Sequence, residues 1–431
     1  MVRNGHVFVR RRQLPQWFTG LLILLPFCFG TLNELLGLPW GIRYLLDVSW
    51  VALLVLLFAR RYRCGNWKVG TTACLTGVFL LFTGAVYGFR YQSGLYYLWG
   101  MRNTFRFYAA FFAFACFLTA EDSRRYLKIL DMLFWVNALV SVWQFFVLGL
   151  AGDFLGGIFG VQKGGNAYTN LFFIIITAKS LVFYLEKRES FLSLAAKCLT
   201  ALAVAAMAEL KFFFVEMIVI LLLAVCLTGP SRRKLWIVLG GLGAVFCGAA
   251  LLTCLFPEFE GWFSADWLVG NALSDKGYTS AGDLNRLNAI HQINRRWLRT
   301  AGQRLVGLGL GNCETSTFAL LNTPFFREFG EMHYTWIGYA FLYLETGWIG
   351  LGLYLSFFAM VFLRCRRIGK DHGGELASVC RLAQILAVLC PLVAVYNSSL
   401  RTEAAYMVYF ILAVPFAMKG MTAHGKGGEG R

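Results

Sequence analysis

"EMHYTWIGYAFLYLETGWIGLGLYL", residues 331–355, leads from a histidine and several aromatic residues into an apolar run. One glutamate, Glu345, and the glycines Gly347, Gly350 and Gly352 interrupt that run. Its second half is typical of the start of a helix that crosses a membrane. Two groups that can ionise, His333 and Glu345, therefore lie at the edge of a predicted span. Their role depends on which side of the membrane they face, so the topology is considered first.

The composition of the whole chain is that of a helical membrane protein. Of its 431 residues, 58% are hydrophobic and only 15% are charged, and the mean hydropathy is +0.60. A soluble chain carries about a quarter charged residues. The apolar residues fall in blocks of about 20, the length that crosses the ~30 Å hydrocarbon core. A β-barrel would instead show alternating strands of about ten residues.

The pattern predicts an all-α integral membrane protein with about twelve transmembrane helices and one large external loop that contains helices. The predicted spans are 17–36, 45–59, 69–89, 98–118, 129–150, 168–185, 191–207, 212–227, 235–256, 348–363, 382–396 and 404–418. Three parts follow: a membrane part over 1–256, an external loop over 257–347, and a membrane part with a cytoplasmic tail over 348–431. The first span is expected to be uncleaved, because no small-residue cleavage site follows it.

The net charge of +17 is explained by membrane orientation, without any nucleic acid. More than half of the 40 lysines and arginines fall in the two termini and in every second connection. The short connections on the other side hold few: Arg43, Arg90, Arg102, Lys163, Lys211 and Arg401. This bias, with an even number of spans, predicts that both termini are cytoplasmic. His333 and the long loop before it then face outward.

An interfacial helix over 333–345 is expected to hold His333 at the external membrane surface. Trp336 and Tyr343 would lie at headgroup depth, and Gly347 would change the direction of the chain. One interpretation of His333 is an ordinary residue of the aromatic belt. The other is a base or proton shuttle, because imidazole titrates near neutral pH.

The external loop is expected to contain a helix over 283–305, with Asp283 as its N-cap and apolar residues at helical spacing. Its arginines can bind phosphate in a bidentate manner. Arg286 is the best candidate, because it lies at the start of the helix on the apolar side. The following "GLGLGN", residues 307–312, is predicted to be a flexible turn, because its spacing and context do not fit a dinucleotide site.

Charges within spans are costly, about 2.5–3.5 kcal/mol each at mid-bilayer, and indicate function unless they pair. Pairs such as Arg106 with Glu216 or Asp47 are one interpretation. The other is that a cluster of external cations binds an anionic ligand from the outer leaflet; its members are Arg90, Arg102, Lys211, Arg286 and Arg401. No aspartate cluster or Cys/His spacing indicates a metal site, so neither a metal nor a cofactor is expected.

These residues carry a resemblance to the O-antigen ligase and Wzy-type polysaccharide polymerase superfamily. Its members have about twelve spans, cytoplasmic ends and a large external loop. That loop carries an arginine, a Gly-x-Gly turn, a histidine and Glu-x-Gly-x-x-Gly. The matching residues here are Arg286, Gly307-Leu308-Gly309, His333 and Glu345-Thr346-Gly347-Trp348-Ile349-Gly350. Lys211 stands where the family tends to have an arginine, and Tyr334 stands where an asparagine usually follows the histidine.

The resemblance implies a metal-independent glycosyltransferase on the outer face of the bacterial cytoplasmic membrane. Its substrate would be an oligosaccharide linked to undecaprenyl diphosphate, and a flippase and a chain-length regulator are possible partners. His333 would act as the base and Arg286 would stabilise the leaving group. The expected substrate-binding residues are Lys211, Arg401, Arg102 and Glu345.

Three activities remain open at this point. A polymerase would join lipid-linked repeats to one another, and a ligase would move the finished glycan to lipid A-core or another acceptor. A transporter or flippase is less favoured, because transporters of this size usually have two similar halves and no internal repeat is found here.

Overall fold

The computed structural model describes residues 13–59, 70–90, 93–229, 231–257 and 282–422, together with Gly261, Ser264 and Asp266. Its first nine long helices are α1 (Gln13–Leu36), α2 (Leu45–Ala59), α3 (Gly70–Arg90), α4 (Gly94–Phe117), α5 (Ala120–Phe146), α6 (Gly165–Leu185), α7 (Phe191–Met207), α8 (Lys211–Thr228) and α9 (Arg232–Leu255). The last three are α14 (Gly338–Asp371), α15 (Gly374–Tyr396) and α16 (Ala405–Thr422). A helix therefore lies at every predicted span.

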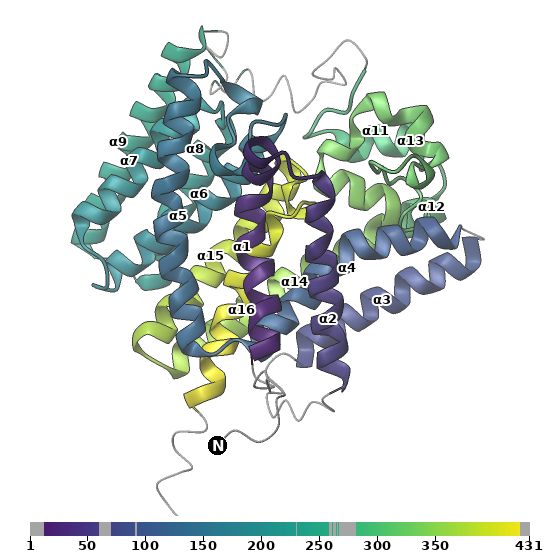
Figure 1. The fold of residues 1–431 in the computed structure, drawn as a ribbon, viewed down its shortest axis with the longest axis horizontal. Helices are drawn as coiled ribbons and strands as arrows, with labels where there is room; N and C mark the ends of the chain where they lie inside the picture. Colours follow the sequence, from purple (N-terminus) through teal and green to yellow (C-terminus); the bar gives the residue numbers. More distant parts are fainter. Residues whose placement is uncertain are drawn as a thin grey trace, which may run out of the picture.

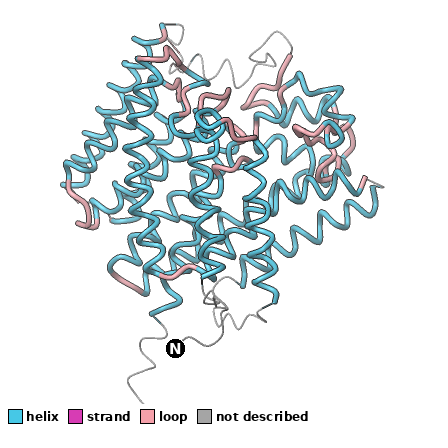
Figure 2. Tube along the Cα trace, viewed as in Figure 1, coloured by secondary structure: helices cyan, strands magenta, loops and turns pink. Residues whose placement is uncertain are grey.

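The predicted all-α class is confirmed for the described part of the chain, which contains no strand (Figure 2). Nine of the described helices are long and apolar enough to cross a membrane, while α7 and α16 hold shorter apolar segments. The total of twelve spans stays a prediction. Helix α1 begins and α16 ends at the same end of the molecule, at the bottom of Figure 1. This placement is what an even number of spans requires.

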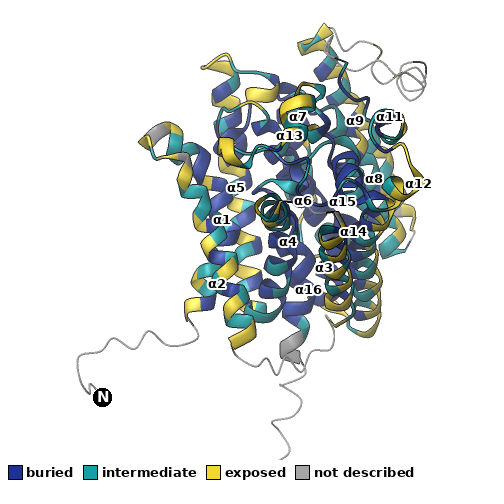
Figure 3. Ribbon diagram, turned by 90° about the vertical axis from the view of Figure 1, so that its right-hand side faces the viewer, coloured by how far each residue is buried: buried dark blue, intermediate teal, exposed yellow. Residues whose placement is uncertain are grey.

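The helices at the centre of the bundle differ from those at its edge in how much surface they bury. In the apolar windows of α6 and α15, 83% and 72% of the residues are buried, against 17% in those of α2 and α9 (Figure 3). Side chains such as Val55 and Phe58 of α2 remain exposed. Exposed apolar residues on outer helices are expected where lipid is the solvent.

Several charged side chains inside the bundle form ion pairs, which was one of the two interpretations of the sequence. Asp131 of α5 accepts from Lys179 of α6 at 2.5 Å and from Lys197 of α7 at 2.9 Å. Lys197 also contacts Glu189 at 2.9 Å. These pairs join three neighbouring helices, and they leave no reason to assign the charges a role in binding.

The connection between α5 and α6 folds back into the bundle instead of lying on its surface. It forms two short 3₁₀ turns, η3 (Gly152–Phe154) and η4 (Gly157–Phe159), and residues 155–160 are buried. Gln144 bonds both backbone groups of Gly157, at 2.8 and 2.9 Å, and Asn137 accepts from the Ile158 N–H at 3.0 Å. A buried irregular backbone needs such partners.

Helix α14 corrects the predicted boundary between loop and span. The helix begins at Gly338, and its first turns are buried in the protein, with Tyr343 fully buried. The predicted start of the helix at 333 is therefore wrong, whereas its placement at the membrane surface stays a prediction. The predicted break at Gly347 is confirmed, since this residue has φ 62° and ψ −164°. Glycine adopts this conformation without the strain that a Cβ would bring.

The described part of the loop predicted to be external contains three short helices, α11 (Ala289–Arg296), α12 (Ala301–Val306) and α13 (Pro324–Phe329), which lie together at the upper right of Figure 1. The single helix predicted over 283–305 is wrong. The chain leaves the helix at Trp297, and Thr300 and Gln303 form a capping box that starts α12. Asp283 is buried and is not the N-cap, a position that Asn288 takes.

Candidate functional site

The glycine-rich segment 307–311 runs against the break in α14 and determines the role of Glu345. The backbone N–H groups of Gly311 and Cys313 donate to Glu345 Oε1 at 3.0 and 3.1 Å. The Gly309 N–H also donates to the Glu345 carbonyl at 2.8 Å. Glu345 is fully buried. Glu345, a predicted substrate-binding residue, therefore binds the backbone of the loop and is not exposed at a surface.

The same glycines permit close contact between backbones on two sides. Gly307, Gly309 and Gly311 have φ values of 74°, 101° and 89°. A Cβ on Gly100 of α4 would lie 2.6 Å from the Cα of Gly311. The predicted turn is confirmed. The prediction that it is flexible is wrong, because the segment packs closely against α4 on one side and α14 on the other.

His333 lies between two 3₁₀ turns, η7 (Gly330–Met332) and η8 (Tyr334–Trp336), at the outer edge of this loop structure. Its backbone is left-handed, with φ 51° and ψ 27°, a conformation that non-glycine residues rarely adopt. Its ring stacks on that of Trp336, with centroids 3.8 Å apart and an interplanar angle of 24°. The Nδ1 atom is buried and has no hydrogen-bond partner.

A buried polar atom without a partner is uncommon and costs about 1–3 kcal/mol. Strained backbone and an unsatisfied imidazole nitrogen coincide at the histidine that the sequence marked as a candidate base. This coincidence favours a functional interpretation of His333 over that of a belt residue.

Arg286 lies at an aromatic stack, and Lys211 is next in sequence to one residue of that stack. The guanidinium of Arg286 lies over the Tyr396 ring, 4.6 Å from its centroid. The other partner of Tyr396 is Phe212 of α8, with centroids 4.5 Å apart and an interplanar angle of 7°. Lys211 precedes Phe212 and begins α8, where its Nζ lies 3.9 Å from Glu209. The stack therefore links the loop, the end of α15 and the start of α8.

Arg286 and His333 are also held close in the fold by the backbone. The Leu284 N–H donates to the Met332 carbonyl at 3.2 Å, and the Tyr339 hydroxyl donates to the Arg286 carbonyl at 2.7 Å. The segment that carries Arg286 thus lies beside the segment that carries His333. This is the pairing that the two catalytic assignments require.

Arg401 lies in the turn η9 (Ser399–Arg401) and is paired with a carboxylate. It forms an ion pair with Glu314, and its guanidinium lies 4.1 Å from the centroid of the Phe341 ring. Burial raises the pKa of the Glu314 carboxyl above its usual value, and the Arg401 charge opposes that shift. The pair therefore joins the external loop to the link between α15 and α16.

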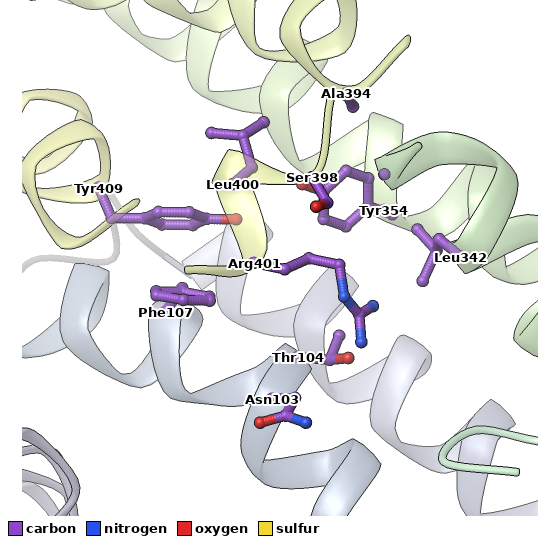
Figure 4. A pocket seen from close by; sticks show the side chains of 11 residues that line it. Asn103, Thr104, Phe107, Leu342, Tyr354, Ala394, Ser398, Leu400, Arg401 and Tyr409 are labelled. Atoms are coloured by element: carbon purple, nitrogen blue, oxygen red, sulfur yellow. The ribbon is translucent and has the colours of Figure 1, made fainter. Parts of the chain in front are cut away.

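A cavity of ≈ 20 Å³ lies beneath Arg401, between α4, α14, α15 and α16. Figure 4 shows the Arg401 side chain reaching toward Thr104 of α4, with Tyr354 and Tyr409 nearby. A water needs about 10–15 Å³ measured in this way. The cavity can therefore hold a water but not a sugar.

Arg102 is paired as well, as part of a row of charges on α4. Its Nε and Nη2 donate to the two oxygens of Asp47 at 3.0 and 2.5 Å. Arg106, one turn further, pairs with Glu403 at 3.3 Å and donates to the Arg401 carbonyl at 2.9 Å. The predicted partners of Arg106, Glu216 and Asp47, are therefore wrong. Burial opposes ionisation of Glu403, but Arg106 and its neighbours hold the pKa of Glu403 below its usual value.

The predicted site residues thus fall into two groups. Arg286 and His333 contact aromatic rings, whereas Lys211, Arg401, Arg102 and Glu345 are engaged in ion pairs or backbone contacts. The side chain of Arg90 lies outside the described residues. The sequence analysis missed three partners that the fold supplies, namely Phe212, Tyr396 and Glu314. Of these three, only Tyr396 could have been noticed in the sequence, because it is an aromatic residue at the end of a predicted span. Aromatic residues are common at that position.

No protein-family model and no curated protein matches this chain. Within the described residues, no group of three or more His, Cys, Asp or Glu side chains could hold a metal ion.

Proposed function

We propose that this chain is a membrane glycosyltransferase that polymerises oligosaccharide repeats carried on undecaprenyl diphosphate, on the outer face of the bacterial cytoplasmic membrane. The observation that carries the proposal is the juxtaposition of Arg286 and His333. A hydrogen bond between Leu284 and Met332 pairs their segments, and His333 has an unsatisfied ring nitrogen. A cation and a base carried on two hydrogen-bonded segments next to apolar helices suit a substrate with a lipid tail, a diphosphate and a sugar.

The proposed reaction needs one base and one anion-binding group. An acceptor hydroxyl oxygen attacks the anomeric carbon of the donor sugar while the bond from that carbon to the diphosphate oxygen breaks. The bonding electron pair leaves on the diphosphate, and the hydroxyl proton passes to a ring nitrogen of His333. Arg286 and Lys211 stabilise the charge that develops on the leaving diphosphate. The products are the elongated lipid-linked glycan and undecaprenyl diphosphate.

The stack at Tyr396 supports the role assigned to Arg286. A guanidinium stacked on an aromatic face is held in one plane, and its planar fork of N–H groups matches the geometry of phosphate oxygens. Lys211 begins α8, and the N-terminus of a helix also favours negative charge. Arg401 and Arg102 form close ion pairs with carboxylates, whereas Lys211 lies 3.9 Å from Glu209, so we assign Arg401 and Arg102 to the support of the site.

The central experiment uses the purified full chain in lipid nanodiscs with lipid-linked oligosaccharide extracted from membranes of the producing cell. A polymerase forms longer lipid-linked products from this single substrate. A ligase forms product only when lipid A-core or another acceptor is added. If neither kind of product forms, and the lipid-linked oligosaccharide moves across the membrane of sealed vesicles, the result would favour a flippase and contradict the proposal.

His333→Ala is expected to abolish product formation while donor binding remains, because the base acts only in the transition state. His291→Ala is the matched control, since His291 is exposed on α11 in the same loop. Binding is measured as retention of radiolabelled donor, and product by gel electrophoresis. Near-normal turnover in His333→Ala would return His333 to the aromatic belt.

Arg286→Ala is expected to lower product formation by about 10²–10³, as removal of one charge-stabilising donor does elsewhere. Arg286→Lys should recover only part of the activity, because lysine lacks the bidentate fork. Arg299→Ala, at an exposed position in the same loop, should leave activity unchanged. Equal activity in all three variants would remove Arg286 from the site.

A further inference from the structure

Trp336 combines an exposed ring with a fixed position. The residue is 41% exposed, yet its ring stacks on that of His333 and its backbone N–H donates to the His333 carbonyl at 2.9 Å. The turn that carries it is anchored at Tyr334, which is fully buried and donates to the Cys313 carbonyl at 2.8 Å. The exposed indole is therefore presented in one orientation beside the proposed base.

A lysine from a distant part of the chain lies over the same ring. The Nζ of Lys163 is 5.8 Å from the Trp336 ring centroid. Lys163 follows the buried turns between α5 and α6, and that segment is fixed by the Val161 N–H, which donates to Glu34 at 2.6 Å. Two independently anchored segments thus bring a cation, an indole and an imidazole to one exposed place.

This cluster has the chemistry of a carbohydrate subsite. The apolar face of a sugar ring packs on the flat indole, and an ammonium group with three donors can bond the hydroxyl or carboxylate groups at the edge of the ring. The diphosphate end of the donor is assigned to Arg286, which lies over the separate Tyr396–Phe212 stack, and to Lys211, which precedes Phe212. The sugar next to His333 is then the one whose hydroxyl loses its proton, which is the acceptor.

We infer that Lys163 and Trp336 form the acceptor-sugar subsite of this protein. The inference rests on the proposed glycosyl transfer and adds to it the place where the second substrate binds. It assigns to Trp336 a role different from that of an interfacial tryptophan, whose ring only needs headgroup depth. Trp348 of α14 offers the comparison, because it is 48% exposed and contacts Tyr343 without a neighbouring base.

The test separates the acceptor from the donor by making the acceptor soluble. Mild acid releases the oligosaccharide from its lipid diphosphate and leaves its non-reducing end intact. This released oligosaccharide is titrated as acceptor against saturating lipid-linked donor, with the full chain in nanodiscs. Variants Trp336→Leu, Trp336→Tyr, Lys163→Gln and Trp348→Leu are compared with the wild type, each checked for a normal amount of folded protein.

Trp336→Leu should raise the KM for the acceptor about tenfold, near the upper range of aromatic contacts, while the KM for the donor is unchanged. Trp336→Tyr should recover most of the loss, because it keeps an aromatic face. Lys163→Gln should raise the acceptor KM about threefold to tenfold. Trp348→Leu should match the wild type.

An unchanged acceptor KM in Trp336→Leu, or an equal rise in Trp348→Leu, would overturn the subsite. Equilibrium dialysis of the radiolabelled oligosaccharide distinguishes this failure from failure of the proposed function. If the wild type binds the oligosaccharide without making product, and Trp336→Leu does not bind it, the subsite is supported and the proposed glycosyl transfer is contradicted. If the wild type neither binds nor transfers, both fall.

Discussion

Tyr396 determines where the charge of Arg286 lies, although it contacts no proposed substrate. Its ring contacts the Arg286 guanidinium and also stacks on the Phe212 ring. A cation over an aromatic ring gains about 0.5–2 kcal/mol, depending on how far the pair is desolvated. Because this attraction depends on the ring and not on the hydroxyl, the contribution of Tyr396 can be separated from that of a hydrogen bond.

Tyr396→Phe is expected to keep nearly full activity, whereas Tyr396→Leu should lower kcat/KM about threefold to thirtyfold, the range of one such contact. The physical reason is that leucine fills space without attracting the guanidinium. Donor titrations measure the effect, and Arg286→Ala provides the background in which the same change at Tyr396 should have little further effect. A loss of equal size in both backgrounds would show that Tyr396 acts through packing alone.

The ion-pair partners of the charged residues were the part of the site that the sequence predicted least well. Arg106 and Glu403 are 297 positions apart, and Arg401 and Glu314 are 87 apart. Charge and hydropathy patterns show that these groups are present in or near spans, but only the packing of α4 against α16 decides which of them meet. The candidates His333 and Arg286 came from local motifs, and their proximity depends on the Leu284–Met332 hydrogen bond.

The glycine-rich segment 307–311 is an element whose shape is set by its neighbours. Its backbone fits between the Gly100 region of α4 and the break at Gly347 of α14, and Glu345 receives its N–H groups. Tight contacts on both sides leave no room for a Cβ. The segment therefore fixes the external loop against the helices that carry the site.

Gly311→Ala is expected to lower the free energy of unfolding by about 1–3 kcal/mol or more, because alanine is strained at φ 89° and its Cβ would overlap the Tyr96 carbonyl. Gly352→Ala is the control, since no atom lies within 4 Å of the position of its Cβ. Thermal unfolding of the purified protein and protease sensitivity of the loop measure the difference. Similar unfolding temperatures for the two variants would contradict the close packing of this segment.

Helix positions were predictable from hydropathy, and boundaries were not. The predicted spans 45–59 and 191–207 coincide with α2 and α7. The prediction placed the start of a helix at 333, whereas residues 334–336 form a 3₁₀ turn and α14 begins at Gly338. It also missed the inward fold of residues 152–160, which depends on amide side chains of α5 that a local pattern cannot assign to it.

At the scale of the whole molecule, the proposals depend on the orientation of the bundle. The loop that carries His333 lies at one end, and the start of α1 and the end of α16 lie at the other. The structure contains no membrane, so the direction of the bundle rests on the excess of lysine and arginine near the termini. An outward-facing site would meet lipid-linked glycans on the external leaflet, whereas the opposite orientation would expose it to the cytoplasm.

Leu320 and Lys370 are suited to a test of this orientation, because both are exposed, one in the external loop and one at the far end of α14. In a chain whose twelve cysteines are replaced by alanine, Leu320→Cys should react with a membrane-impermeant thiol reagent in intact cells, and Lys370→Cys should react only after the membrane is opened. Product formation by the background chain shows that it is folded. Labelling of Lys370→Cys alone in intact cells would place His333 and Arg286 in the cytoplasm. In that case the external acceptor and the leaving diphosphate would both be out of reach, and the glycosyl transfer proposed here could not occur.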